Sequence, residues 1–138
     1  MPIDPGVREL FAGANFVHLA TLTSDGSPHS VAIWADAFDD DHVVFFTNVG
    51  SQKAKNLERD PRLAMSLVDR DDPYRTGILR GRLARTIEGD EARPIVDAIS
   101  HKYTGKPFPY SDSVVYVVAA ERSRLISLSD SFDDTPAA

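Results

Sequence analysis

The chain has 138 residues, of which 42% are hydrophobic and 26% charged, a composition typical of a globular protein with its own core. The formal net charge of −6 argues against a nucleic-acid binder, because phosphate backbones require a broad basic surface. Cysteine is absent, which excludes disulfides, thiolate metal sites and cysteine nucleophiles.

No stretch has the apolar core of a signal peptide, and no apolar run approaches membrane-spanning length. We therefore expect a soluble, cytoplasmic protein without a membrane or nucleic-acid partner. The composition predicts one domain over residues 1–129 and an acidic, flexible tail over residues 130–138.

The first third of the chain predicts a helix and three strands. Asp4 precedes a proline and is a typical helix start. Residues 16–23 and 28–35 are rich in β-branched and aromatic residues, and Asp25-Gly26 between them is a strong hairpin signal. Residues 42–47 form the next strand after an acidic turn, so we predict an antiparallel meander of three strands.

The remainder predicts four further strands and a second long helix. Gly77 and Gly81 interrupt one of the strands, which indicates a bulge or a sharp bend. The helix begins at Asp90, runs to about Tyr103 and ends at Gly105. The strands are expected over residues 63–68, 74–87, 114–121 and 125–129.

This pattern is mainly β with inserted helices. Antiparallel strands avoid exposed edges best by closing into a barrel, so we predict an antiparallel split β-barrel of Greek-key type. An open α+β sandwich is the alternative. The chain lacks the long alternation of strands and helices that a doubly wound parallel sheet requires.

The segment over residues 45–57 is the most informative one. A strand ends near Thr47, a turn follows, and Ser51 is placed to cap a helix that continues to about Arg59. Lys53 and Lys55 lie in the first turn of that helix, where the helix dipole disfavours cations unless an anion joins them. The segment therefore predicts a phosphate-binding site; the alternative is a solvated basic helix end.

In that alternative, Lys55 pairs with Glu58 three residues on. Trp34, the only tryptophan, lies on a strand near this segment. It is either a core residue or part of a binding site for a planar cofactor that carries its own chemistry.

Metal-dependent and nucleophilic catalysis and a glycine-rich nucleotide site have little support in the sequence. The four histidines lack metal-ligand spacing, although His18 and His29 could face each other across the hairpin, and no nucleophile elbow or glycine-rich nucleotide motif occurs. Asp69, Asp71 and Asp72 could bind a cation but are more typical of a solvated acidic loop. We predict no metal site and nominate no catalytic residue.

The sequence FTNVGSQKAKNL over residues 46–57, followed by Asp60-Pro61-Arg62, resembles the signature of the pyridoxamine 5′-phosphate oxidase-like split-barrel superfamily. The segments over residues 19–22, 25–28 and 31–34 match the usual order of that superfamily, and with Gly81 the resemblance covers about half of the chain. The chain looks most like the small actinobacterial deazaflavin-dependent oxidoreductases.

The resemblance implies a homodimer of six-stranded barrels that binds FMN, or its deazaflavin relative coenzyme F420, at the subunit interface. It also implies which residues contact the cofactor. Thr47, Ser51 and Lys53 would hold the phosphate, two strands would flank the ring system, and Tyr74 would reach the partner's cofactor. The complete implied set is Leu19, Ala20, Thr21, Ser30, Val31, Ala32, Trp34, Thr47, Asn48, Ser51, Gln52, Lys53, Lys55 and Tyr74.

Two departures argue against a vitamin-B6 oxidase. Gln52 stands where those oxidases carry arginine, and residues 133–138 lack their arginine-bearing substrate motif. Loss of one arginine suits the singly charged phosphodiester of F420 better than the phosphate of FMN. We therefore expect an F420-dependent oxidoreductase that transfers hydride to or from a small organic substrate. The alternatives are an FMN-dependent oxidoreductase and a non-catalytic cofactor-binding protein.

Overall fold

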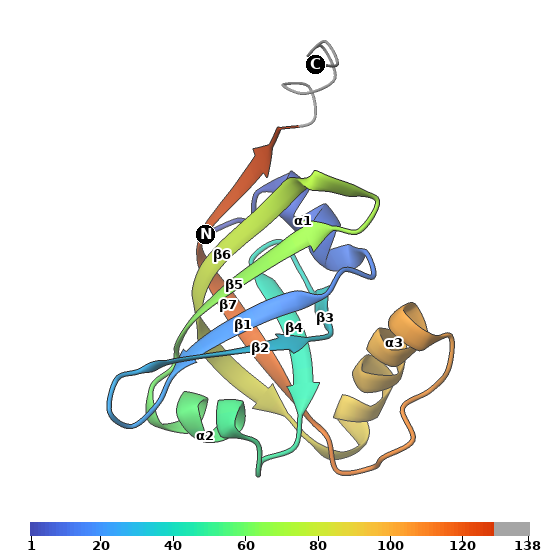
Figure 1. Ribbon diagram of the computed structural model, residues 1–138. Coiled ribbons are helices and arrows are strands. Elements are labelled where there is room, and N and C mark those ends of the chain that lie inside the picture. The colour runs from blue at the N-terminus through green and yellow to red at the C-terminus, as the bar shows by residue number, and fades with distance from the viewer. Residues whose placement is uncertain (129–138) are drawn as a thin grey trace.

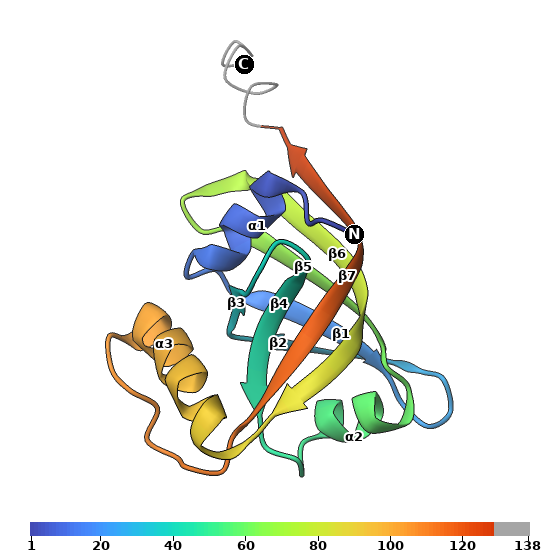
Figure 2. The ribbon, with the colours of Figure 1, turned by 180° about the vertical axis from the view of Figure 1, so that it is seen from behind.

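A computed structural model describes residues 1–128 of the chain; the predicted acidic tail lies outside the described residues. Seven antiparallel strands form one sheet in the order β2-β1-β5-β6-β7-β4-β3, which curls around a core (Figures 1 and 2). The strands are β1 (Val17–Leu22), β2 (Pro28–Ile33), β3 (Ala35–Ala37), β4 (His42–Thr47), β5 (Arg62–Asp69), β6 (Asp72–Ile87) and β7 (Val114–Ser127). The predicted split-barrel fold is confirmed.

Three α-helices and one 3₁₀ turn connect the strands. The helices are α1 (Pro5–Ala12), α2 (Gln52–Arg59) and α3 (Ala92–Thr104), and the 3₁₀ turn (Gly89–Glu91) precedes α3. Asp4 caps α1 as predicted, since its carboxylate accepts the backbone N–H groups of Gly6 and Val7. Gly105 ends α3 in the left-handed conformation, with φ of 77°. No helix within residues 1–128 is long and apolar enough to cross a membrane.

The predicted three-stranded meander is wrong. β1 and β2 form the expected hairpin, but β2 is one edge of the sheet, whereas β4 lies near the other edge and pairs with β3 and β7. The expected strand 28–35 stops at Ile33, and after Trp34 the chain enters β3 at the opposite edge. The connection at Trp34 therefore joins the two edges of the curled sheet and nearly closes the barrel.

Two smaller expectations also differ from the structure. The two predicted closing strands are one continuous strand, β7, because pairing with β6 continues on both sides of a bulge at Glu121. Gly81 does lie at a register shift, but Gly77 pairs regularly with Leu67 and Leu125. At Gly77 a side chain would instead crowd Leu67 and Leu10.

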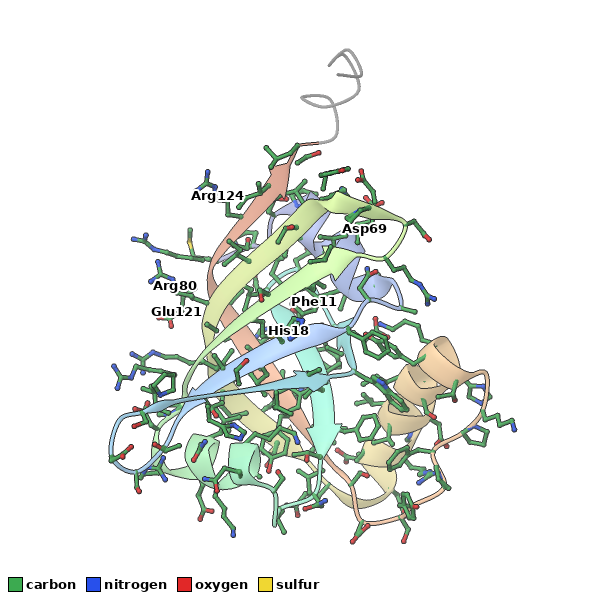
Figure 3. All side chains as sticks on the ribbon, in the orientation of Figure 1. Phe11, His18, Asp69, Arg80, Glu121 and Arg124 are labelled. Atoms are coloured by element: carbon green, nitrogen blue, oxygen red, sulfur yellow. The ribbon has the colours of Figure 1, made fainter. Side chains whose placement is uncertain are left out.

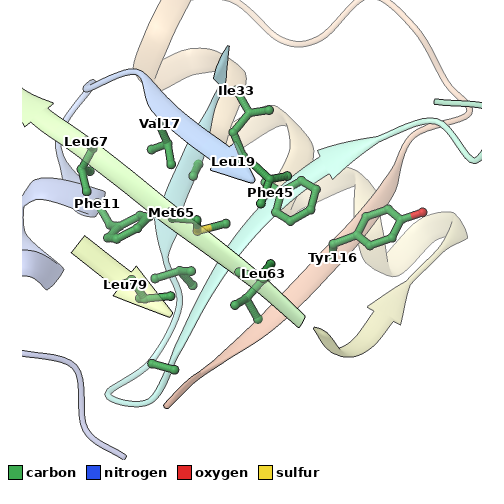
Figure 4. Packing of buried hydrophobic residues seen from close by; sticks show 14 of the residues in the cluster. Phe11, Val17, Leu19, Ile33, Phe45, Leu63, Met65, Leu67, Leu79 and Tyr116 are labelled. Atoms are coloured by element: carbon green, nitrogen blue, oxygen red, sulfur yellow. The ribbon is translucent and has the colours of Figure 1, made fainter. Parts of the chain in front are cut away.

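The barrel interior is an apolar core to which α1 and α2 contribute. Phe11, Leu57 and Phe45 are almost fully buried in it, from α1, α2 and β4 respectively. Figure 4 shows how Leu19, Met65 and Leu79 meet there from three strands. On the outer face of β6 and β7, Arg80, Glu121 and Arg124 project into solvent (Figure 3).

A second apolar cluster lies on the outside of the barrel, under α3. Val44 on β4 and Val117 on β7 face it, so these strands are buried on both faces. Polar contacts fix α3 to the edge strand β3. Lys102 Nζ donates to the carbonyl of Ala35 at 2.5 Å and contacts Asp36 at 3.3 Å, and the Tyr103 hydroxyl donates to the Asn15 carbonyl at 2.5 Å.

We predict that Gly81→Ala destabilises the fold by about 1–3 kcal/mol, the usual cost of overpacking. A Cβ at this bulge would lie 2.2 Å from the Ala119 carbonyl oxygen, a backbone atom that cannot rotate away. Gly77→Ala is the matched control, because its Cβ would meet only movable side-chain ends at 3.0 and 3.1 Å. Urea unfolding of both variants tests this, and equal losses would contradict the explanation.

Candidate functional site

The turn between β4 and α2 is built from its own polar side chains. Ser51 is the N-cap of α2, as predicted: its hydroxyl oxygen accepts the Ala54 N–H at 3.2 Å and the Thr47 hydroxyl hydrogen at 3.1 Å. Asn48 accepts the Gly50 N–H at 3.1 Å. Because Ser51 Oγ already accepts two hydrogen bonds, its own hydroxyl hydrogen is free to be donated to an acceptor beside the helix end.

α2 is fixed across one end of the barrel by its buried face. Ala54 and Leu57 are in the core, and Asn56 is fully buried. The Asn56 side chain donates to Thr21 Oγ1 at 3.0 Å and accepts from Gln52 Nε2 at 2.8 Å. This buried face fixes the rotation of α2 about its axis. Lys53 therefore lies on the other face of the helix.

Lys53 is a half-buried cation without a counterion among the described residues. Within residues 1–128 its ammonium has no carboxylate within 4 Å and no hydrogen-bond acceptor. Burial lowers the pKa of this ammonium below the usual value for lysine, because the charged form loses hydration. An anion at this place would restore the lost stabilisation of the charge.

Lys53 borders an open pocket of about 260 Å³ whose other lining residues are aliphatic or aromatic. The lining residues are Ala32, Ile33, Trp34, Phe46, Lys53 and Phe108. A second cavity of about 410 Å³ shares Phe46 and Phe108 and extends past Thr47 and Asn48 to Tyr110, Asp112 and Ser113. The half-buried ammonium of Lys53 and a group of aromatic side chains thus lie side by side.

Trp34 lines the first of these pockets and also packs against the cluster under α3. Its indole stacks on Tyr103 with ring centres 5.4 Å apart and 8° between planes. The rings of Phe46 and Phe108 meet it edge-on, at 71° and 84°. The packing interpretation of Trp34 is confirmed, and its place in a cofactor site stays a prediction.

Several of the expected site residues do not present side chains to this cavity. Leu19 and Thr21 point into the barrel, where Leu19 is fully buried and Thr21 binds Asn56. Val31 packs against the core from inside. These residues can contact a ligand only through their backbone, and β2 is an edge strand whose outer backbone groups have no strand partner among the described residues.

The other expected residues lie on the surface. Ala20 and Ser30 are opposite each other on the outer face of the β1–β2 pair. The Gln52 side chain donates a hydrogen bond to Asn56, and Lys55 is exposed. Tyr74 lies at the start of β6, at the end of the sheet opposite α2 (Figure 1). Within one chain it does not meet the residues around Lys53.

Two side-chain contacts that the sequence suggested are not found among the described residues. The Lys55–Glu58 ion pair is absent from the part of the chain that the structure describes. His18 faces outward opposite Ala32, whereas His29 lies opposite Thr21, so the two histidines do not face each other. Residues 1–128 contain no cluster of three or more potential metal ligands. Asp69 forms an ion pair with Arg75.

Sequence reasoning missed Phe46 and Phe108. Phe46 lies in the segment that resembles the family signature but is not among the expected site residues, although its outward position on β4 brings it under α3. Phe108 lies in the loop over residues 105–113, whose aromatic and proline content was the only available signal. Nothing local in the sequence indicates that this loop returns to Trp34.

Comparison with known proteins shows which family and which structures this chain resembles. The pyridoxamine 5′-phosphate oxidase family matches residues 3–127. The pyridoxine/pyridoxamine 5′-phosphate oxidase of Dichelobacter nodosus is 36% identical over 64 residues, which are 46% of this chain and 28% of that protein. The chain thus matches little more than a quarter of the length of this curated relative.

Two solved structures are similar over most of their length. An F420 reductase is 27% identical with a TM-score of 0.76, over 88% of this chain and 98% of the other. A conserved hypothetical protein from Mycobacterium tuberculosis is 25% identical with a TM-score of 0.79, over 100% of this chain and 91% of the other.

We predict that Ser51→Ala lowers the free energy of unfolding by about 1 kcal/mol, the usual cost of losing an N-cap. Ser51→Asp should keep nearly wild-type stability, because aspartate also accepts the N–H groups of a first helical turn. Urea unfolding of the two variants tests the capping role. If both were equally destabilised, the cap would not be what Ser51 contributes.

Proposed function

The chain belongs to the pyridoxamine 5′-phosphate oxidase family, and from that membership we propose that it is an oxidoreductase that uses the deazaflavin coenzyme F420. It would transfer hydride to or from a small organic molecule. The observation that carries the proposal is Lys53, a half-buried ammonium beside a group of aromatic side chains and without a counterion in the described part of the chain. When bound, the coenzyme supplies the hydride chemistry, and the protein supplies binding and orientation.

The residues of the β4–α2 turn suit a phosphate group. The Ser51 hydroxyl has a hydrogen to donate, and Lys53 supplies the positive charge. The backbone N–H groups of the first turn of α2 have no acceptor within the helix, and the helix dipole favours an anion there. Exposed Lys55 adds only a long-range attraction, which salt screens.

Two observations favour F420 over FMN. Gln52 adds no charge and is held by Asn56, so one ammonium dominates the site and suits a singly charged phosphodiester. The similar F420 reductase, at 27% identity, covers nearly the whole chain. The pyridoxine/pyridoxamine phosphate oxidases match a shorter segment, and FMN remains the alternative cofactor.

We also propose a homodimer with the cofactor at the subunit interface. Around the exposed His18, the outer face of β1, β2 and β5 carries small side chains, which favour the close approach of a second sheet: Ala20, Ser30, Ala32, Ala64 and Ser66. Tyr74, half-exposed near the start of β6, would then reach the partner's site.

Equilibrium titration of the apo-protein with F420 and with FMN tests the choice of cofactor. We expect tighter binding of F420; tight FMN binding without F420 binding would contradict the proposal. The loaded, reduced protein should then be reoxidised by an organic acceptor. If a broad survey of quinones and enones finds no reoxidation above background, the protein is a cofactor-binding module instead.

We predict that Lys53→Ala weakens F420 binding by about 1.5–3 kcal/mol, the range for a hydrogen bond to a charged group. Lys55→Ala removes the same charge from an exposed position two residues away and should cost less than about 1 kcal/mol. Titration calorimetry at one salt concentration compares them. Equal effects would mean that only long-range charge matters and would remove Lys53 from the site.

A further inference from the structure

The loop over residues 105–113 is held against α3 along its whole first half. At its start, the Ser100 hydroxyl donates to the Lys106 carbonyl at 2.7 Å. Further along, Asp97 accepts the Phe108 N–H at 3.0 Å, and Arg93 donates to the carbonyls of Phe108 and of Tyr110, the latter at 2.6 Å. Both backbone groups of Phe108 are thus fixed by charged side chains.

The two charged residues are also paired with each other. The guanidinium of Arg93 lies 2.8 Å from the carboxylate of Asp97, one helical turn further along α3. Its planar fork reaches two carbonyls and one carboxylate at once, a geometry that the single ammonium of lysine does not reproduce. We call Arg93 and Asp97 the loop clamp. Such a clamp lowers the entropy that the loop would lose on binding a ligand.

The clamp places the Phe108 ring where it lines both cavities together with Phe46. Its centre is 4.8 Å from the Phe46 ring, at 69°, and 6.4 Å from the Trp34 ring, at 84°. Phe108 lines both the 260 Å³ and the 410 Å³ cavity. Three rings at steep angles to one another form a corner, and such a corner leaves flat, apolar walls for a planar molecule.

We propose that the corner formed by Trp34, Phe46 and Phe108 binds the substrate of the reaction, and that this substrate is a planar, apolar, conjugated ring compound. Arg93 and Asp97 act as positioning residues through Phe108. The inference rests on the proposed function in one respect: the occupant is the hydride donor or acceptor only if the neighbouring Lys53 end binds the cofactor. Binding of the planar compound itself is independent of this.

Trp34 is the only tryptophan of the chain and therefore reports directly on this corner. We predict that menadione, a planar quinone, quenches Trp34 fluorescence saturably, whereas camphor, a non-planar ketone of similar size, does not compete with it. Phe108→Leu should weaken menadione binding about 3- to 10-fold, the size of one aromatic contact. Phe108→Tyr keeps the ring and should bind menadione with nearly wild-type affinity. Camphor competing as well as a planar analogue would overturn the proposed selectivity.

The clamp is tested by Arg93→Lys, which keeps the charge but not the fork. We expect Arg93→Lys to weaken menadione binding by about 3-fold or more relative to wild type. Its melting temperature and its F420 affinity should stay close to wild type. Lys106→Gln changes an exposed side chain of the same loop and should leave menadione binding unchanged. Wild-type menadione affinity in Arg93→Lys would show that the clamp does not position Phe108 for binding.

Equilibrium dialysis of menadione with and without saturating F420 separates this inference from the proposed function. Binding to both forms supports a substrate site beside the cofactor. Loss of menadione binding in the loaded protein would assign the corner to the cofactor ring and overturn the inference, with the proposed function intact. Failure of both cofactors to bind, with Phe108-dependent menadione binding preserved, would overturn the proposed function alone.

Discussion

The packing of α2 across the end of the barrel is the constraint on which the candidate site depends. Its buried face contributes Ala54 and Leu57 to the core, and its buried amide, Asn56, would be costly to leave without the bonds it makes to Thr21 and Gln52. Since the helix cannot rotate without breaking these contacts, Lys53 stays beside the aromatic cavity. The loss of hydration that lowers its pKa is therefore imposed by the fold.

The site is assembled from four segments that are distant in the sequence. The connection at Trp34 joins the two edges of the sheet, β4 contributes Phe46 and Thr47, α2 contributes Lys53, and the loop after α3 contributes Phe108. Each segment is fixed independently, by barrel closure, by strand pairing, by the core and by the loop clamp. The site is thus largely formed before any ligand arrives, which reduces the entropic cost of binding.

Much of the local structure follows from the sequence, because its signals act over a few residues. Asp25-Gly26 predicts the first hairpin, and Ser51 predicts the start of α2. The meander failed because strand pairing is decided by which edges of the curled sheet are free, and no local feature marks Trp34 as the crossing point. Phe108 escaped notice for a similar reason: Arg93 and Asp97, which place it, precede it by 15 and 11 residues.

The central claim is that the Lys53 ammonium is a partly dehydrated charge that an anionic cofactor neutralises. Side-chain NMR titration of Lys53, in the free protein and with saturating F420, measures this directly. The account predicts a pKa below the usual lysine value in the free protein and a rise on binding, because a nearby anion favours the charged form. An ordinary lysine pKa that the cofactor leaves unchanged would contradict it.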